Sequence, residues 1–158
     1  MKRKFLLIHC LLFIVSTGYS QILQNEKGVY LDKNNQPFTG IYKEYFDNGN
    51  IRIEMTLKQG IQDGITNIYF ENGIKNEQRS YDTGQMHGTW ITWNELEVKL
   101  AEANYHFGRK HGMWYIWDEN GILRYEMQYN YGNKTGIWKM YNDSGLLVNE
   151  KDYSKKEE

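Results

Sequence analysis

Cysteine is nearly absent from this sequence, since Cys10 is the only one in 158 residues. It lies in an apolar run within the first twenty residues, so the rest of the chain has neither disulfide bonds nor thiolate chemistry available. Proline is equally scarce, with Pro37 alone. No long stretch shows an apolar period of 3.6 residues, and we therefore expect very little helix after the N-terminal segment.

The N-terminal segment has the pattern of a secretory signal peptide. A basic start at residues 2–4 precedes an apolar run of 11 residues, Phe5–Val15. This run is too short to span a bilayer, and the small residues Gly18 and Ser20 precede a plausible cleavage point at Gln21. We expect residues 1–20 to be removed and the chain to be exported to the periplasm or the extracellular space, with no transmembrane segment in the mature chain.

The mature chain also lacks a strong charge of either sign. Without the three basic residues at positions 2–4, 16 basic and 20 acidic residues remain, a formal charge of −4. Nucleic-acid binding requires a concentrated basic footprint, which is missing here. A general attraction to anionic lipid is disfavoured for the same reason.

Glycine and aromatic residues are abundant instead, and they recur with a constant step of 24 residues. The chain holds 15 Gly, 13 Tyr and 5 Trp, a composition that suits short strands joined by tight turns. Several series keep this step without an insertion, which indicates five tandem copies of one unit. The main series are Gly40, Gly64, Gly88, Gly112 and Gly136; Gly60, Gly84, Gly108 and Gly132; Tyr45, Tyr69, Trp93, Trp117 and Tyr141; and Leu57, Tyr81, Tyr105, Tyr129 and Tyr153.

Each unit reads as a β-hairpin. In the fourth copy, two strand-like segments at 112–118 and 123–129 flank Asn120-Gly121. Asn-Gly favours a two-residue type I′ turn, because both of its central positions need positive φ. The links between units read as longer glycine-bearing turns. In the third copy Leu96-Glu97 replaces Asn-Gly, and we expect a wider or shifted turn near Asn94.

The predicted fold is all-β: an elongated antiparallel meander of tandem hairpins with about ten strands. Residues 40–154 would form five 24-residue repeats, 21–39 an N-terminal cap and 155–158 a polar tail. With a two-residue turn, Gly112 lies opposite Tyr129, and the equivalent glycines lie opposite Tyr81, Tyr105 and Tyr153. An aromatic ring in this position covers the backbone that glycine leaves bare. The same register predicts cross-strand ion pairs Lys43–Glu54 and Lys139–Glu150.

Alternation of side chains then sorts two faces. The more apolar face is the expected core side, and it carries Tyr42, Ile68, Trp90, Trp114, Ile116, Trp138, Met140 and the four tyrosines named above. The other face combines aromatic and acidic residues and is the candidate binding face: Tyr45, Tyr69, Trp93, Trp117, Tyr141, Glu54, Gln78, Glu102, Glu126 and Glu150.

Two segments carry a family resemblance. "YHFGRKHGMWYIW" at 105–117 and "YNYGNKTGIWKMY" at 129–141 resemble the MORN repeat, Tyr-x-x-Gly-x-x-x-Gly-x-Trp. The period of 24, the turn "ENG" and the entry "PFTGIYKEYFDNG" at 37–49 resemble the bacterial variant in the YwqK-type antitoxin-like family. The resemblance covers residues 30–154. It implies a meander of β-hairpins and contacts with proteins or membranes, and it implies no catalytic residues.

No residue pattern indicates catalysis or a cofactor. His87 and His111 are one repeat apart, with His106 nearby, and we interpret them as residues that fill turns between units rather than as metal ligands, which must converge. Glu54, Glu102, Glu126 and Glu150 recur with the period, whereas a catalytic pair of carboxylates normally breaks repeat symmetry. We expect solvated ion pairs here.

The expected function is therefore that of an exported, non-enzymatic repeat protein that binds or scaffolds an unidentified protein through an extended sheet face. Rows of Tyr and Trp make good contact surfaces because they lose little entropy on binding. One alternative is a cell-envelope carbohydrate-binding module that uses the aromatic ladder. Another is an antitoxin-like or immunity-like inhibitor of a partner protein.

Overall fold

The computed structural model describes residues 22–154 and shows an all-β protein, as predicted. The predicted signal peptide and polar tail lie outside these residues. No helix long and apolar enough to cross a membrane occurs between residues 22 and 154. The strands are β1 (Leu23–Gln24), β2 (Tyr30–Leu31), β3 (Gly40–Tyr45), β4 (Ile51–Lys58), β5 (Ile61–Tyr69), β6 (Lys75–Asp82), β7 (Gln85–Met86), β8 (Gly88–Trp93), β9 (Lys99–His106), β10 (Arg109–Lys110), β11 (Gly112–Trp117), β12 (Leu123–Asn130), β13 (Asn133–Tyr141) and β14 (Leu147–Asp152).

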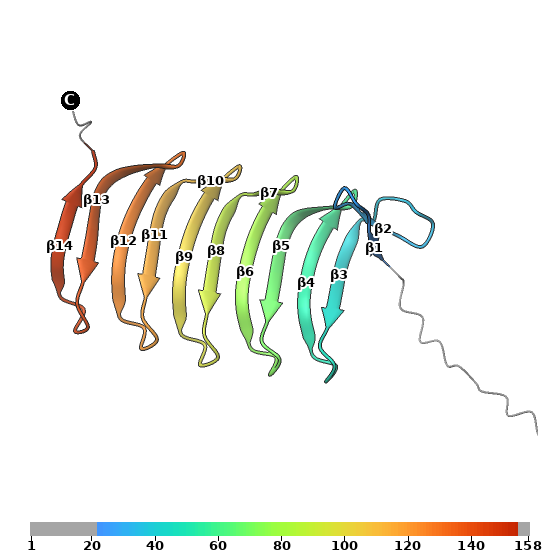
Figure 1. The fold of residues 1–158 in the computed structure, drawn as a ribbon, viewed down its shortest axis with the longest axis horizontal. Helices are drawn as coiled ribbons and strands as arrows, with labels where there is room; N and C mark the ends of the chain where they lie inside the picture. The colour runs from blue at the N-terminus through green and yellow to red at the C-terminus, as the bar shows by residue number, and fades with distance from the viewer. Residues whose placement is uncertain (1–21, 155–158) are drawn as a thin grey trace, which may run out of the picture.

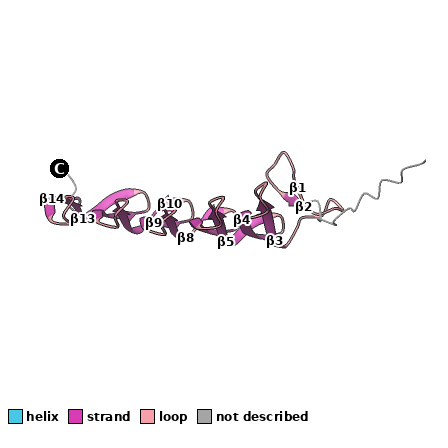
Figure 2. Ribbon diagram, turned by 90° about the horizontal axis from the view of Figure 1, so that it is seen from below, coloured by secondary structure: helices cyan, strands magenta, loops and turns pink. Residues whose placement is uncertain are grey.

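One antiparallel sheet runs through the molecule in sequence order (Figure 1). Its main path joins β3, β4, β5, β6, β8, β9, β11, β12, β13 and β14, and the short strands β7 and β10 pair with β6 and β9 beside that path. Figure 2 shows the sheet edge-on as a single layer, with the β1–β2 hairpin standing over the end near β3. The ten-strand meander predicted from the period of 24 is confirmed.

The predicted register is confirmed through most of each hairpin. Gly112 pairs with Tyr129 and Trp114 with Met127, and the glycine–tyrosine pairing recurs in the second and third copies. In the last copy the Tyr153 amide donates to the Gly136 carbonyl at 2.8 Å. The register shifts by one residue near the turn, between Ile116 and Trp117.

This shift shows that the predicted turn types are wrong. The sequence predicts a two-residue turn within each hairpin and a longer turn between units, and the structure has the reverse arrangement. In the hairpin turn of the fourth copy only the last residue has positive φ: Gly121 is at 80°, and its amide donates to the Asp118 carbonyl at 3.0 Å. That is the three-residue loop whose glycine forms a bulge. The two-residue turns with two positive φ values join successive units instead, as at Phe107 (43°) and Gly108 (78°). Arg124 is an extra residue between the pairs Trp117↔Leu123 and Ile116↔Tyr125, and this second bulge restores the register that a two-residue turn predicts.

The third copy has the same hairpin turn as the others, so the predicted widening near Asn94 is wrong. Glu97 takes the glycine position with φ of 60°, and its amide donates to the Asn94 carbonyl at 3.0 Å. The Asn94 side-chain oxygen also accepts from the amides of Leu96 and Val98, both at 3.0 Å. These two bonds hold the turn, and Leu96 never has to adopt positive φ.

We expect Glu97→Gly to stabilise the protein. Left-handed φ costs a non-glycine residue about 1–2 kcal/mol. Glycine avoids this cost, but it loses more conformational entropy on folding, which offsets part of the stabilisation. The net increase in the free energy of unfolding should be about 0.5–1 kcal/mol, measured by chemical denaturation. Glu95→Gly in the same loop has no positive φ to relieve and serves as the control. An equal increase in both variants would contradict this reading of the turn.

The expected burial of the apolar face is also wrong, because one layer of strands has nothing to cover it. The buried side chains among the described residues are Met55, Leu57 and Thr66, at 4%, 1% and 3% exposure. All three lie near the N-terminal hairpin, where Tyr30 contacts Tyr42 with ring centroids 5.1 Å apart. Between residues 75 and 154 no side chain is fully buried. A sheet of this kind exposes both faces along most of its length.

Candidate functional site

The apolar face carries an unbroken row of alternating tyrosine and tryptophan rings, which we call the ladder face. Neighbouring ring centroids are 4.9–5.5 Å apart and the rings are tilted against one another, a favourable geometry for aromatic pairs. The row consists of Tyr81, Trp90, Tyr105, Trp114, Tyr129, Trp138 and Tyr153.

The indole nitrogens fix this row to the sheet. The Nε1–H of Trp114 donates to the Asn104 carbonyl at 2.9 Å, and Trp90 and Trp138 make the same bond one unit before and one unit after. Each acceptor lies ten residues before its tryptophan, so the period of the sequence repeats the bond. Burial raises the pKa of Tyr105 and of Tyr129, as expected for half-buried phenols.

Lysines lie over the rings in the C-terminal half of the ladder face. The Lys110 ammonium is 4.3 Å from the Trp114 centroid and 4.9 Å from that of Tyr129. One unit later, Lys134 is 4.5 Å from the Trp138 centroid. Lys151 lies 5.1 Å from the ring of Tyr153. These cation–π contacts place positive charge directly on an aromatic surface.

The same half of the ladder face holds no carboxylate among the described residues. By register, its side chains from β9 to β14 are Ala101, Ala103, Tyr105, Lys110, Trp114, Ile116, Tyr125, Met127, Tyr129, Lys134, Trp138, Met140, Asn149, Lys151 and Tyr153. The surface is therefore apolar, aromatic and positively charged. The sequence identified the rings of this face but assigned them to a core.

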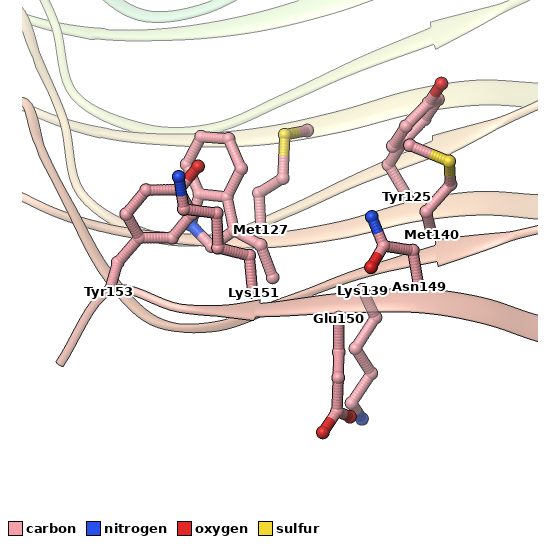
Figure 3. A pocket seen from close by; sticks show the side chains of 9 residues that line it. Tyr125, Met127, Lys139, Met140, Asn149, Glu150, Lys151 and Tyr153 are labelled. Atoms are coloured by element: carbon pink, nitrogen blue, oxygen red, sulfur yellow. The ribbon is translucent and has the colours of Figure 1, made fainter.

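A shallow pocket of about 310 Å³ lies on this face between β12 and β14. Figure 3 shows Tyr125, Met127, Met140 and Lys151 on one side of the sheet, and Lys139 and Glu150 pointing to the opposite side. Tyr125 and Met140 are 40% and 38% exposed. The pocket is thus the most open apolar part of the ladder face, near the edge strand β14.

The opposite face, which we call the glutamate face, is the binding face predicted from the sequence. Three of its four glutamates are paired with lysines: Glu54 lies 2.7 Å from Lys43, Glu102 2.9 Å from Lys99 and Glu126 3.3 Å from Lys139. The Lys43–Glu54 ion pair is confirmed. Lys139 does lie opposite Glu150, but its ammonium turns to Glu126 in the neighbouring unit, so the predicted Lys139–Glu150 ion pair is corrected.

The aromatic residues of the glutamate face interact with these charges rather than with one another in a continuous row. The Tyr141 hydroxyl donates to Glu126 at 2.9 Å, and burial together with this bond raises the pKa of Tyr141. Lys99 lies 5.4 Å from the Trp117 ring centroid, and Trp117 contacts Tyr115 at 5.6 Å. Tyr69, Trp93 and Gln78 are half-buried, and Tyr45 is 48% exposed. The charges of this face are largely balanced within the chain.

A cluster of imidazole rings was missed by the sequence analysis. His106 lies between His87 and His111, with ring centroids 5.1 and 5.6 Å away, and Phe107 and Tyr131 pack against it. The sequence placed His87 and His111 on separate turns and did not predict that His106 bridges them. No group of three or more His, Cys, Asp or Glu side chains within residues 22–154 is arranged to hold a metal ion.

Alkaline pH should test the packing around the ladder face. Burial and the neighbouring Glu44 raise the pKa of Tyr42 to about 12, and its hydroxyl donates to Glu44 at 3.1 Å. The pKa of Tyr42 is higher in the folded state than its ordinary value of 10.0, so the folded state favours the protonated phenol. The resulting stabilisation is fully present below pH 10 and is lost as the pH rises to about 12.

The urea midpoint of the wild type should therefore fall between pH 10 and 12, and Tyr42→Phe should lessen that fall. Tyr125→Phe, at an exposed tyrosine on the same face, is the matched control for the removal of one phenolic hydroxyl. Identical pH profiles for wild type and Tyr42→Phe would show that Tyr42 ionises as it does in the unfolded chain.

The fold and the two faces define a single-layer β-repeat protein. Residues 38–59 and 110–131 match the family model described as a MORN repeat variant. Their starting points are 72 residues apart, three times the period of 24, so both matches lie in the same register of the repeat. They correspond to β3–β4 and to β11–β12 and support a MORN-repeat protein. No curated protein matches the chain.

Proposed function

We propose that this chain is a non-enzymatic repeat protein that binds another protein through the C-terminal half of its ladder face, from β9 to β14. The repeat match and the single-layer sheet are compatible with an interaction protein. A large flat face without a covering layer is typical of a surface that a partner covers.

The observation that carries this proposal is the combination of rings and unpaired lysines. Lys110, Lys134 and Lys151 make cation–π contacts, and none forms an ion pair with a carboxylate in the part of the chain that the structure describes. Lys110 and Lys134 follow the period, so they recur about every 9.6 Å across the strands. A partner with an acidic, partly apolar surface would pair with these lysines and bury the rings.

The glutamate face is less suited to this role because its charges already have partners. Glu54, Glu102 and Glu126 each form an ion pair with a lysine of this chain. A partner would have to replace those contacts, which lowers the net gain on binding. The carbohydrate-binding alternative, which uses the rings of this face, becomes the competing outcome of the experiment.

Purification from the envelope fraction with a tagged chain tests the proposal. We expect one protein to co-purify stoichiometrically, and Lys110→Glu/Lys134→Glu to lose it by at least about tenfold, since like charges would then face each other. The matched control on the other face is Trp93→Ala/Trp117→Ala, which should retain the partner. Retention on peptidoglycan or polysaccharide that is lost in this control variant would support the carbohydrate alternative and contradict the proposal.

We further propose that the chain acts outside the cytoplasm after cleavage before Gln21. The support is the basic start, the apolar run and the small residues of the first twenty positions. Mass spectrometry of the chain recovered from its native cells should give an N-terminus at Gln21. A chain that stays in the cytosolic fraction and retains residues 1–20 would contradict export.

A further inference from the structure

The sheet ends in two strands that are each paired on one side only. Among the described residues, β14 pairs with β13 alone and β3 pairs with β4 alone. The β1–β2 hairpin belongs to a separate sheet and contacts the main sheet through Tyr30, whose amide donates to the Gly60 carbonyl at 2.8 Å. The backbone edges of β3 and β14 are therefore open to another strand.

These two edges are the two halves of a junction that the chain already makes four times. The second strand of each unit pairs with the first strand of the next, as in Tyr125↔Met140 between β12 and β13. The same junction occurs as Ile53↔Ile68, Glu77↔Thr92 and Ala101↔Ile116, each one period apart. Within residues 22–154, β14 is a second strand that no first strand follows, and β3 is a first strand that no second strand of a repeat precedes. One more step of 24 places Asn149 of one copy opposite Glu44 of another.

The charges at this further junction are complementary. The same step places Glu150 opposite Lys43 of the next copy, as Glu126 lies opposite Lys139 inside the chain. That internal pair is an ion pair of 3.3 Å. Lys43 and Lys139 are equivalent positions four periods apart, and the positions between them are Asn67, Ile91 and Tyr115.

Glu150 itself makes no ion pair within 4.0 Å to any residue between 22 and 154. The lysine that a following unit would supply is thus missing within one chain and present on β3 as Lys43. Lys43 pairs with Glu54 of its own hairpin at 2.7 Å, so at the junction it would turn from Glu54 to Glu150, as Lys139 turns from Glu150 of its own hairpin to Glu126.

The aromatic row of one copy would reach Tyr42 of the next. Tyr129 contacts Trp138 across β12 and β13 at 5.1 Å, and one period later Tyr153 would face Tyr42 of the next copy. Tyr42 occupies the tryptophan position of its unit. The Tyr42 ring already contacts Tyr30 of its own chain at 5.1 Å. The ion pair of an internal junction is therefore the contact that only a second copy can complete at the free ends.

We propose that copies of this chain associate head to tail, with β14 of one copy pairing antiparallel to β3 of the next and Glu150 facing Lys43. The junction repeats the internal register, so the sheet and its ladder face continue from copy to copy. A contact between two different edges is heterologous, so it produces assemblies larger than a dimer, either open chains of subunits or, where the rotation closes, rings. The pairing strands are short, so the association is reversible and depends on concentration. This inference does not depend on the identity of any partner protein.

A charge swap tests the register directly. Light scattering of the purified full chain over a broad concentration range should show a mass that rises past the dimer. Glu150→Lys alone and Lys43→Glu alone each place like charges opposite one another, and each should associate at least about tenfold more weakly. An equal mixture should associate as the wild type does. In this mixture, β14 of the Glu150→Lys variant can pair with β3 of the Lys43→Glu variant, and β14 of the Lys43→Glu variant can pair with β3 of the Glu150→Lys variant. Both junctions then place opposite charges against each other.

Two controls keep the result interpretable. Glu119→Lys changes an exposed charge in a hairpin turn away from both edges and should associate like the wild type. Glu150→Gln removes the charge without reversing it and should give an intermediate loss, with circular dichroism confirming that each variant folds. A wild type that stays monomeric at every concentration, or a mixture that associates no better than the single variants, would overturn the proposal.

Discussion

Replacing Trp114 by alanine should remove about 3 kcal/mol from the free energy of unfolding. Its ring contacts Tyr105 and Tyr129 at 5.1 and 5.3 Å, carries the Lys110 ammonium at 4.3 Å and donates to the Asn104 carbonyl at 2.9 Å. Deleting a buried tryptophan costs about 3–5 kcal/mol, and partial exposure places this one at the lower end. The loss is large against a typical total of about 5–15 kcal/mol.

Trp117→Ala is the matched control, since it removes the same residue type from the glutamate face of the same strand. Trp117 contacts Tyr115 at 5.6 Å and Lys99 at 5.4 Å but belongs to no continuous row, and about 1 kcal/mol should be lost. Chemical denaturation followed by circular dichroism measures both values. Equal losses would show that the ladder row adds nothing beyond the burial of single rings.

Gly60→Ala should destabilise the protein by about 3 kcal/mol and detach the N-terminal hairpin. Gly60 has φ of 77°, and a Cβ there would lie 2.4 Å from Val29 Cγ1 and 2.7 Å from the Tyr30 carbonyl oxygen. Left-handed φ costs alanine about 1–2 kcal/mol, and crowding against packed atoms adds about 1–3 kcal/mol. Because the backbone of Tyr30 is one of the obstacles, the hairpin must move.

Gly108→Ala separates these two effects. Gly108 occupies the same position of the same kind of turn with φ of 78°, and a Cβ there meets nothing within 4 Å. It should cost only the backbone term of about 1 kcal/mol. Hydrogen exchange should rise at Val29 and Tyr30 in Gly60→Ala and stay unchanged in Gly108→Ala. Similar losses in both variants, without faster exchange at Tyr30, would contradict the assigned role of the hairpin.

The repeat made most of the fold predictable. Five copies in one register determine the number of strands, and an Asn-Gly or Ser-Gly pair marks the turn in four of the five hairpins. The turn types could not be read in the same way, because Gln59, Thr83 and Phe107 adopt positive φ despite their bulk. They do so because a glycine follows each of them and the short link between units leaves no other turn available. The recurring Asp118 and Asn142, whose side chains accept turn amides, were an available signal for the turn at Asn94.

The candidate site was harder to predict because alternation shows which residues share a face but not whether anything covers that face. The same Trp and Tyr positions would form a core in a two-layer protein. A single layer instead leaves Tyr125 and Met140 exposed. The lysines over the rings were also hidden, since Lys110 and Lys134 read as turn residues in the sequence. Their contact with Trp114 and Trp138 follows from the short link between units, which brings each lysine back over the sheet.

Hydroxyl-radical footprinting of the chain with and without its co-purified partner tests the central claim most directly. We predict that the partner shields Tyr125 and Met140 on the ladder face and leaves Tyr45 on the glutamate face as reactive as in the free chain. Shielding of Tyr45 with unchanged reactivity of Tyr125 and Met140 would contradict the claim that the ladder face is the binding surface.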